Sequence, residues 1–514
     1  MPRVSDRQAA CALFLIAFSI VGAFVAMGIQ MTADDGFYYL VIARNVASGG
    51  GSTFDGLHPT NGYHPLWLLL LVPLAAAWPE RLAEAATLLQ GVLWGAAGAL
   101  VYLVARRAGH ERGVLRRRGM GRLASALAAI AFWGFTVRQA ACGVEFSLQA
   151  LGIAAAALAW THLADAPDRR RACLHLGALA ALAFLARLET AALAGLLGLA
   201  LFAELRGDPM RRRCLAAFAA PLALAAIAWG VLELFLFGHL LPVSAAVKGA
   251  WSAQLLAADA TAAGGVLAAK LQHLREILGE VLRRRPELLA GLLASLVARP
   301  GRLAKVLGAR SPFVLYAAVQ LAACALLYHD GLSLVPWYFV VQPLLTALWI
   351  GAALEAGTGA LRTRLPRAAT VVAAAALLLV LGWTLRRGWG ERARLAPERL
   401  PLRNAALWCR AHLPADAVIG SWNAGTLGYL SGRRVIDLDG VVNSWEYFER
   451  ERFDLCAYWQ RNGVTHVVDV FDGGQASSVV PTLPAYAPCA GRLVPIGVAP
   501  GDPRNGRAVI HQLR

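Results

Sequence analysis

The stretch from Ala33 to Trp67, ADDGFYYLVIARNVASGGGSTFDGLHPTNGYHPLW, decides how the rest of the chain is interpreted. Residues 9–29 before it are long enough to cross a bilayer, since a spanning helix needs roughly 20 mainly apolar residues. The stretch itself holds adjacent carboxylates, a run of glycines, histidines and aromatic side chains, but a single arginine. Because cytoplasmic loops are rich in arginine, we interpret residues 31–64 as a polar loop on the outer side of a membrane.

The composition of the whole chain supports a membrane protein. Of its 514 residues, 58% are hydrophobic and 16% are charged. An ordinary soluble domain has roughly 45–50% and about 25%, so a soluble enzyme and a disordered chain are excluded. The net charge of +17 would suggest a nucleic-acid partner in a soluble protein. In a membrane protein this excess marks cytoplasmic loops, and we therefore expect no nucleic acid.

Hydropathy predicts about eleven membrane-spanning helices. They lie at residues 9–29, 87–105, 122–137, 146–163, 173–187, 190–205, 214–237, 286–298, 312–328, 334–355 and 367–385. Arginine clusters at 106–122, 169–171 and 206–213 then share one, cytoplasmic, side. Residues 66–78 are short for a crossing and are predicted to be re-entrant or interfacial, and the amphipathic residues 267–282 to be interfacial. The short span at 286–298 leaves a ten-span alternative, with the C-terminal region inside.

The composition changes near residue 396. Helix-like segments at 400–412 and 445–461 alternate with β-rich VIGSW (418–422), a glycine-rich turn, RVIDLDG (434–440) and THVVDV (465–470). Alternating strands and helices predict a small α/β domain. We divide the chain into a membrane module at 1–390, with outer loops 31–64 and 238–285, and an extracytoplasmic domain at 391–514. In an oxidising compartment, two of Cys409, Cys456 and Cys489 could form a disulfide.

Asp34 and Asp35 directly follow the first span. Neighbouring carboxylates repel, so one pKa is expected to be raised, which suits a proton acceptor. The alternative is that they begin a helix, because aspartate caps helix N-termini and FYYLVIARN has the spacing of an interfacial helix. The same loop holds His58, Asn61, Tyr63 and His64. This mixture of hydrogen-bonding and aromatic groups is typical of sugar binding, with simple packing of the two histidines as the alternative.

Further ionisable residues fall on the same predicted outer face. They are Arg138 and Glu145, Arg187 and Glu189, His239 and Lys248, and His329 and Asp330, which precede Trp337 and Tyr338. Charges at membrane depth are costly and usually face a cavity or a partner, although Arg187 and Glu189 could form a structural ion pair. Acids at 34, 35 and 145 with cations at 44, 187 and 248 predict a site for a phosphate-bearing substrate and a proton transfer.

These motifs resemble those of integral-membrane glycosyltransferases of the GT-C fold, which use polyprenyl-phosphate-linked sugars. The branch that includes arabinofuranosyltransferases is the most similar. The segments that carry the resemblance are DDGFYYLVIARN, GGGSTFDG and NGYHPLW in the first loop, then GVEF, RLE, FGHLLPVSAAVK and GTLGYLSGRRVIDLDG. The chain departs from that branch at Leu188, where members often have proline, and at PWYF (336–339), where they often have arginine.

The resemblance implies an inverting glycosyltransferase, moving a hexosyl or pentosyl group from a polyprenyl-phosphate donor to an acceptor hydroxyl. The acceptor would be a cell-envelope glycan, lipid or protein at the outer face of the cytoplasmic (inner) membrane, with the chain's N-terminus inside and membrane lipid around it. Asp34 would be the general base, with Asp35 or Glu145 orienting the acceptor. Lys248, Arg187 and Arg44 would bind the donor phosphate. Sugar or acceptor contacts are assigned to His58, Asn61, Tyr63, His64, Glu189, His239, His329, Trp337 and Tyr338.

No cofactor is expected, because Arg and Lys alone can neutralise one phosphodiester, although some GT-C enzymes use a divalent metal. Two other functions fit a polytopic protein with outer charges. One is a transporter or flippase for lipid-linked sugars, which would usually show paired halves and broken helices. The other is a polysaccharide polymerase or ligase.

Overall fold

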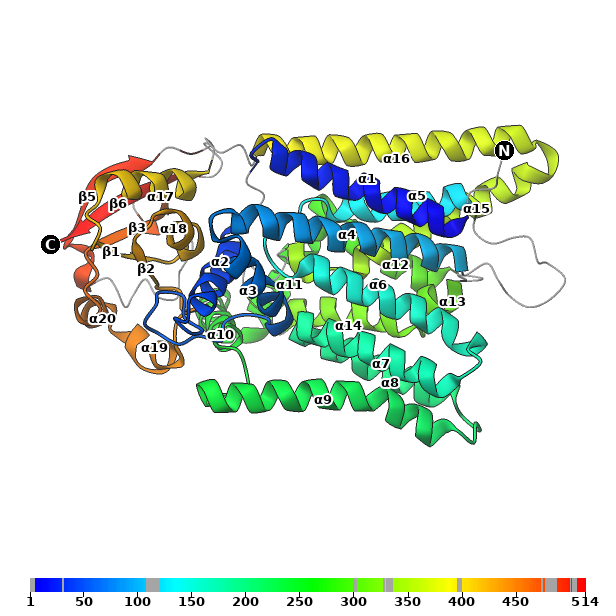
Figure 1. The fold of residues 1–514 in the computed structure, drawn as a ribbon, viewed down its shortest axis with the longest axis horizontal. Coiled ribbons are helices and arrows are strands. Elements are labelled where there is room, and N and C mark those ends of the chain that lie inside the picture. Colours follow the sequence, from blue (N-terminus) through cyan, green and yellow to red (C-terminus); the bar gives the residue numbers. More distant parts are fainter. Residues whose placement is uncertain are drawn as a thin grey trace.

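The computed structural model describes residues 5–29, 32–107, 121–298, 303–326, 329, 336–394, 400–472, 475–476, 488–499, 501 and 506–514. Its helices form an elongated bundle with a small sheet domain at one end (Figure 1). The predicted fold class, an apolar helical protein with a small C-terminal α/β domain, is confirmed.

The bundle is built from helices that run along its long axis. They are α1 (Asp6–Ala26), α4 (Leu82–Arg107), α5 (Arg122–Thr136), α6 (Phe146–His162), α7 (Arg169–Ala186), α8 (Ala191–Glu204), α9 (Arg211–Phe237), α12 (Glu287–Val297), α13 (Ala304–Leu307), α14 (Pro312–Leu326), α15 (Val341–Arg364) and α16 (Pro366–Arg394). Helix α1 packs on α4, α7 packs on α9, and α5 packs on both α15 and α16. Among the described residues, six helical segments are long and apolar enough to cross a membrane. The chain is therefore an integral membrane protein, while the count of eleven spans stays a prediction.

The outer surface of the bundle is suited to lipid. Helices α9 and α16 lie along opposite edges (Figure 1), and α9 exposes Leu224, Ile227, Val231 and Phe235. Such a continuous apolar surface would be a liability in water and is normal against acyl chains. The α6–α7 and α8–α9 connections, where the arginine clusters fall, lie at the end of the bundle opposite the sheet (Figure 1).

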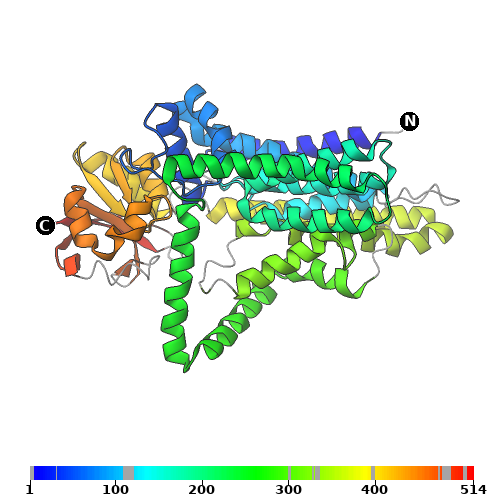
Figure 2. The same cartoon turned by 90° about the horizontal axis from the view of Figure 1, so that it is seen from below.

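Four further helices do not run along the long axis of the bundle. They are α2 (Asp34–Ala47), α3 (Pro65–Ala77), α10 (Val243–Ala263) and α11 (Val266–Arg284). Helices α3 and α11 coincide with the two segments expected to be interfacial. Together α10 and α11 project from the bundle as an arm (Figure 2), and α11 exposes Leu267, Leu271 and Leu278 along one side.

The C-terminal domain is a mixed sheet with helices packed around it. The strands are β1 (Val418–Ser421), β2 (Arg434–Asp437), β3 (His466–Asp472), β4 (Gln475–Ala476), β5 (Leu493–Ala499) and β6 (Arg507–Leu513), and the helices are α17 (Pro401–His412), α18 (Ala424–Leu430), α19 (Trp445–Glu449) and α20 (Leu455–Arg461). The order is β2-β1-β3-β6-β5, with β4 paired to the end of β3. Strands β2, β1 and β3 are parallel, so their carboxyl ends meet at one edge, where open α/β sheets bind ligands.

Two local predictions in this domain were wrong. The segment after β1, expected to be a glycine-rich turn, contains helix α18, because its N-terminus is capped by a residue from the other end of the chain, as described below. The helix expected over 445–461 is broken into α19 and α20 by a short 3-10 turn, Glu451–Phe453.

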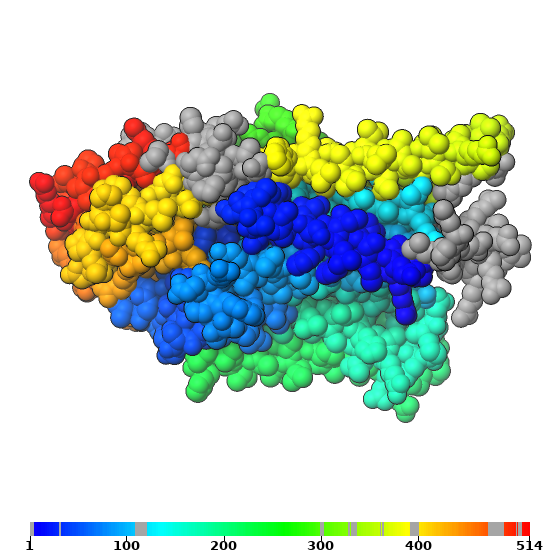
Figure 3. Space-filling view, turned by 45° about the horizontal axis from the view of Figure 1, so that its top comes forward, coloured from blue at the N-terminus to red at the C-terminus, as the bar shows by residue number. Residues whose placement is uncertain are grey.

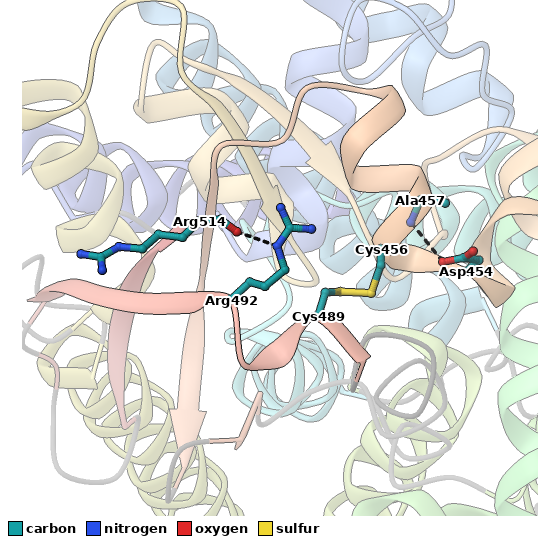
Figure 4. Close-up of a disulfide and its surroundings, with 6 residues drawn as sticks. All are labelled: Asp454, Cys456, Ala457, Cys489, Arg492 and Arg514. Atoms are coloured by element: carbon teal, nitrogen blue, oxygen red, sulfur yellow. Dashed lines mark hydrogen bonds between the residues drawn. A yellow bond between two sulfur atoms is a disulfide. The ribbon is translucent and has the colours of Figure 1, made fainter.

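The expected disulfide joins Cys456 of α20 to Cys489, with a Cα–Cα distance of 5.7 Å (Figure 4). Cys409 is buried and free. The disulfide ties α20, which begins at the capping residue Asp454, to the segment that leads into β5. The segment that leads into β5 and β6 is therefore bonded covalently to α20.

Candidate functional site

Two sides of helix α2 face different parts of the molecule. Residues four apart lie on the same side of a helix, whereas adjacent residues point in different directions. Asp34 and Tyr38 therefore share one face, and Asp35 and Tyr39 share another. The two carboxylates that look equivalent in the sequence enter different surroundings.

The Asp34 face holds the C-terminal domain. The Asp34 carboxylate accepts hydrogen bonds from the backbone N–H groups of Gly425, at 3.2 Å, and Thr426, at 2.7 Å, and from the Thr426 hydroxyl at 2.6 Å. The Tyr38 hydroxyl accepts from the Ala424 N–H at 3.3 Å. Gly425 is required here, because a Cβ would overlap the Asp34 carbonyl. Asp34 thus caps the N-terminus of α18, and Figure 3 shows the first outer loop, in blue, directly against the C-terminal domain.

The surroundings of the Asp35 carboxylate differ from those of Asp34. Its carboxylate receives no side-chain hydrogen bond from another residue in the part of the chain that the structure describes, and it is only half-buried. Burial raises the pKa of Asp35, the nearby Lys248 lowers it, and Asp34 and Glu145 raise it further. The net direction is upward, which favours a carboxylate that can take up a proton.

The Tyr39 face leads to a buried ion-pair network. Glu145 accepts hydrogen bonds from the Tyr39 hydroxyl at 2.7 Å and from Arg187 Nη1 at 2.5 Å. Arg187 also donates to Glu189 at 2.5 Å and to the Trp337 carbonyl at 3.4 Å. Both oxygens of Glu145 are therefore engaged, and its effect is to fix Arg187. No described residue accepts a hydrogen bond from Nη2 of Arg187, which leaves that group for another ligand.

Lys248 joins this network through Tyr338. Its Nζ donates to the Tyr338 hydroxyl at 2.9 Å and lies 5.5 Å from the centre of the ring. The Arg187 guanidinium lies 4.9 Å from the centre of the same ring, so two cations flank one tyrosine. Burial opposes the charge on Lys248, but Tyr338 and Asp35 outweigh it and raise its pKa. The ammonium is therefore charged, and no second described residue accepts a hydrogen bond from it, which leaves two N–H donors for a ligand.

His64 completes this cluster from the end of the first loop. Its Nε2 lies 3.7 Å from Glu145, and its Nδ1 is buried without a hydrogen bond to any residue that the structure describes. Burial lowers the pKa of His64, and Arg187 and Lys248 lower it further although Glu145 opposes them, so the ring is neutral near pH 7. Its free ring nitrogen is available to a polar ligand.

The other predicted site residues lie elsewhere. Arg44 stacks on Tyr429 at 3.8 Å and donates to the Pro79 carbonyl, so it fastens α2 to its neighbours rather than meeting Lys248. His58 pairs with Asp55, Tyr63 bonds Ser52, His239 stacks on Trp445, and His329 bonds Asp259 on α10. Asp330 lies outside the described residues.

Asn61, in the first loop, forms hydrogen bonds to three other parts of the molecule. It is fully buried, and its amide donates to Glu233 of α9 and to the Leu241 carbonyl. Its carbonyl accepts from the Val243 N–H at 2.9 Å and from Trp445 Nε1 at 3.1 Å. The side chain thus connects the first loop, the bundle, the start of α10 and the C-terminal domain.

Replacement of Asn61 by alanine should destabilise the protein more than it affects chemistry. Each buried partner left without a hydrogen bond costs about 1–3 kcal/mol, and the Glu233 carboxyl and the Trp445 indole would both be left. The measurement is the midpoint of thermal unfolding in detergent. Asn462→Ala, which removes one hydrogen bond to the Tyr458 carbonyl at the end of α20, is the control. Equal midpoints for the two variants would contradict the stabilising role of the Asn61 hydrogen bonds.

Two acids near the site were not among the predicted site residues. Asp437, at the end of β2, and Asp439 just after it both act electrostatically on Tyr38, and Asp439 also interacts with Asp35. The signal was present as RVIDLDG, since residues at the carboxyl end of a parallel strand are candidates for ligand binding. No group of three or more His, Cys, Asp or Glu with metal-binding geometry occurs among the described residues.

The C-terminal region matches one family, described as "Domain of unknown function (DUF8728)", over residues 390–493. No curated protein matches the sequence.

Solved structures match over nearly the whole chain. ArnT from Cupriavidus metallidurans bound to undecaprenyl phosphate has a TM-score of 0.59 and 16% identity, covering 98% of this chain and 97% of that one. The oligosaccharyltransferase AglB from Archaeoglobus fulgidus, in complex with an inhibitory peptide and a dolichol-phosphate, has a TM-score of 0.51 and 12% identity, covering 90% and 69%. The mycobacterial arabinofuranosyltransferase AftD has a TM-score of 0.49 and 17% identity, covering 100% and 40%. The first two of these matches confirm the predicted GT-C fold.

Proposed function

We propose that the protein is an inverting glycosyltransferase that moves a sugar from a polyprenyl-phosphate donor to an acceptor hydroxyl. The observation that carries the proposal is the cluster at the sheet end of the bundle, where Lys248 and Arg187 flank Tyr338 beside the unoccupied carboxylate of Asp35. Transfer from such a donor needs fixed positive charge for the departing phosphate and a base for the acceptor hydroxyl. The GT-C fold, shared with an enzyme bound to undecaprenyl phosphate, supports this assignment.

Asp35 is the better candidate for the base than Asp34. A proton acceptor needs a free lone pair; three hydrogen bonds engage both oxygens of Asp34, whereas no described residue donates a side-chain hydrogen bond to Asp35. Asp35 would take the proton of the acceptor hydroxyl as that oxygen attacks the anomeric carbon from the side opposite the phosphate. The sugar–phosphate bond breaks, and the phosphate leaves with its electron pair.

The two cations would receive the departing phosphate. Lys248 offers two N–H donors and Arg187 offers Nη2, so each can bond a phosphate oxygen in a site that is partly closed to water. Glu145 and Glu189 hold the Arg187 guanidinium in place. Since one phosphodiester can be neutralised by these groups, the proposal includes no divalent metal.

Lys248→Ala should weaken the use of the donor rather than of the acceptor. Loss of one charge-assisted hydrogen bond predicts a rise in the donor KM of about 10-fold or more. The measurement is initial rate against donor concentration, with EDTA present throughout. Lys270→Ala, on the neighbouring helix α11 and without a hydrogen bond or ion pair to a described residue, is the matched control. An unchanged donor KM would remove Lys248 from the phosphate site.

We further propose that the site and the C-terminal domain face outward from the cytoplasmic membrane. The Cys456–Cys489 disulfide supports this orientation, because disulfides persist in oxidising compartments. The arginine-rich connections at the opposite end of the bundle support it as well. Labelling of Cys456 and Cys489 in intact cells by a membrane-impermeant maleimide, only after reduction, is the expected result. Labelling that requires permeabilised cells would reverse the orientation.

The decisive test of the function is direct. Purified protein is incubated with a panel of undecaprenyl-phosphate-linked sugars and with octyl glycosides as hydroxyl-bearing acceptors, and products are read by mass spectrometry. The expected product carries one added sugar, and the NMR coupling constant of its anomeric proton shows the inverted configuration. Absence of transfer from every donor, with the folded state verified by thermal unfolding, would contradict the proposal.

A further inference from the structure

The short loop after β2, residues 438–443, lies against two segments that carry residues of the proposed site. A Cβ on Gly62 would overlap the Val441 carbonyl, which places the loop against the first outer loop two residues before His64. A Cβ on Gly440 would lie 3.3 Å from Val247, the neighbour of Lys248 on α10. The loop therefore touches both segments that carry the neutral and positive groups of the site.

Contacts with α2 and with the rest of the C-terminal domain fix the position of the loop. Asp34 and Tyr38 hold α18 and the end of β1 against α2, and β2 pairs with β1 in parallel register up to Asp437. The Tyr447 hydroxyl donates to the Leu438 carbonyl at 2.5 Å, and the Asn443 amide donates to the Asp437 carbonyl at 2.6 Å. The carboxyl edge of the parallel strands is thereby turned toward Asp35.

Asp437, the last residue of β2, and Asp439, in the loop, form an interacting carboxyl pair. Asp437 is buried and accepts the Val442 N–H with Oδ2, while its Oδ1 has no hydrogen-bond donor among the described residues. Asp439 is half-buried and accepts the Val441 N–H. Burial raises the pKa of Asp439, and the Asp437 charge raises it further, so this pair takes up a proton more readily than an isolated aspartate does. Two contacting carboxyl groups that share one proton can both donate and accept a hydrogen bond.

We propose that Asp439 binds the acceptor, contacting one of its hydroxyl groups across from Asp35, so that the C-terminal domain forms the acceptor side of the site. This inference rests on the proposed function. A neutral polyhydroxyl ligand, such as a sugar or a sugar-bearing lipid, suits a carboxyl group that lies at the edge of this loop, because its hydroxyl groups can donate to a carboxylate oxygen and accept from a protonated one. An anionic ligand would be repelled by Asp35 and the pair, and it belongs instead beside Lys248 and Arg187.

The test separates acceptor from donor. Asp439→Asn should raise the KM for octyl glycosides at least 10-fold, while the donor KM and the binding of undecaprenyl phosphate change less than 2-fold. The matched control is Asp416→Asn, an exposed aspartate in the same domain without a hydrogen bond to a described residue. An unchanged acceptor KM, or an equal rise of both KM values, would overturn the role of Asp439.

A folding defect is distinguished by a second variant. Should Asp439→Asn lower the midpoint of thermal unfolding, Asp439→Glu keeps the carboxyl group and is expected to recover part of the acceptor KM. Failure of Asp439→Glu to do so with a normal midpoint would also overturn the inference. Failure of the proposed function itself is visible separately, since the wild type would then transfer no sugar at all.

Discussion

Asp35→Asn is expected to lower the kcat of sugar transfer by about 10²–10⁴-fold, the usual contribution of a general base. Asparagine has nearly the same shape and keeps one acceptor oxygen, but it cannot take up a proton. Because Asp35 makes no side-chain hydrogen bond to another described residue, the change should leave the midpoint of thermal unfolding and the donor KM nearly unchanged. The measurement is kcat at saturating donor and octyl glycoside, together with the unfolding midpoint.

Asp34→Asn is the matched control for this prediction. It weakens hydrogen bonds to the start of α18, and bonds to a charged group contribute about 1.5–3 kcal/mol each. The expected result is a lower unfolding midpoint and a smaller loss of kcat than in Asp35→Asn. Normal turnover in Asp35→Asn with abolished turnover in a stably folded Asp34→Asn would exchange the two roles.

Arg187→Ala is expected to destabilise the protein by about 3–5 kcal/mol, because removal of one partner from a buried ion pair leaves an uncompensated charge. The charge left behind is Glu145, which is 3% exposed and would keep only the Tyr39 hydroxyl and the distant His64. The measurements are the unfolding midpoint in detergent and the donor KM of the fraction that stays folded.

Arg187→Lys tests whether charge alone is sufficient. Lysine cannot reproduce the fork that reaches Glu189 and Glu145 at once, so stability should recover only in part. Arg212→Ala, an exposed arginine at the opposite end of the bundle without an ion pair to a described residue, should change the midpoint little. A midpoint for Arg187→Ala equal to that of Arg212→Ala would contradict the buried network.

The sequence was sufficient for the fold class, and three of the residues it selected lie together in the structure. Continuous apolar segments reveal spanning helices because a bilayer imposes their length. Arg187, Lys248 and Glu145 could be selected because charged groups beside such segments are costly and need partners. The structure brings these three together with Asp35 and Tyr338, although they come from segments as distant in sequence as residues 35 and 338.

Other features depend on contacts that no local pattern contains. The adjacent residues Asp34 and Asp35 cannot be distinguished in the sequence. In the structure, the direction of α2 places Asp34 against the C-terminal domain, where Thr426 binds it. Helix α18 was expected to be a turn because its glycines disfavour a helix in isolation, whereas its cap comes from Asp34. Arg44, a cation in the right loop, is held by Tyr429, which lies 385 residues away.

The bond between Asp34 and Thr426 spans 392 residues and sets an order for the making of the molecule. Chains grow at about 5–20 residues per second, so the N-terminal helix waits roughly 20–80 s for its partner to be synthesised. During that interval the Asp34 carboxylate lacks its hydrogen bonds to Thr426, which distinguish it from Asp35. The proposed site therefore becomes complete only after Thr426 has been made, and a ribosome that stops earlier releases a chain that lacks this contact.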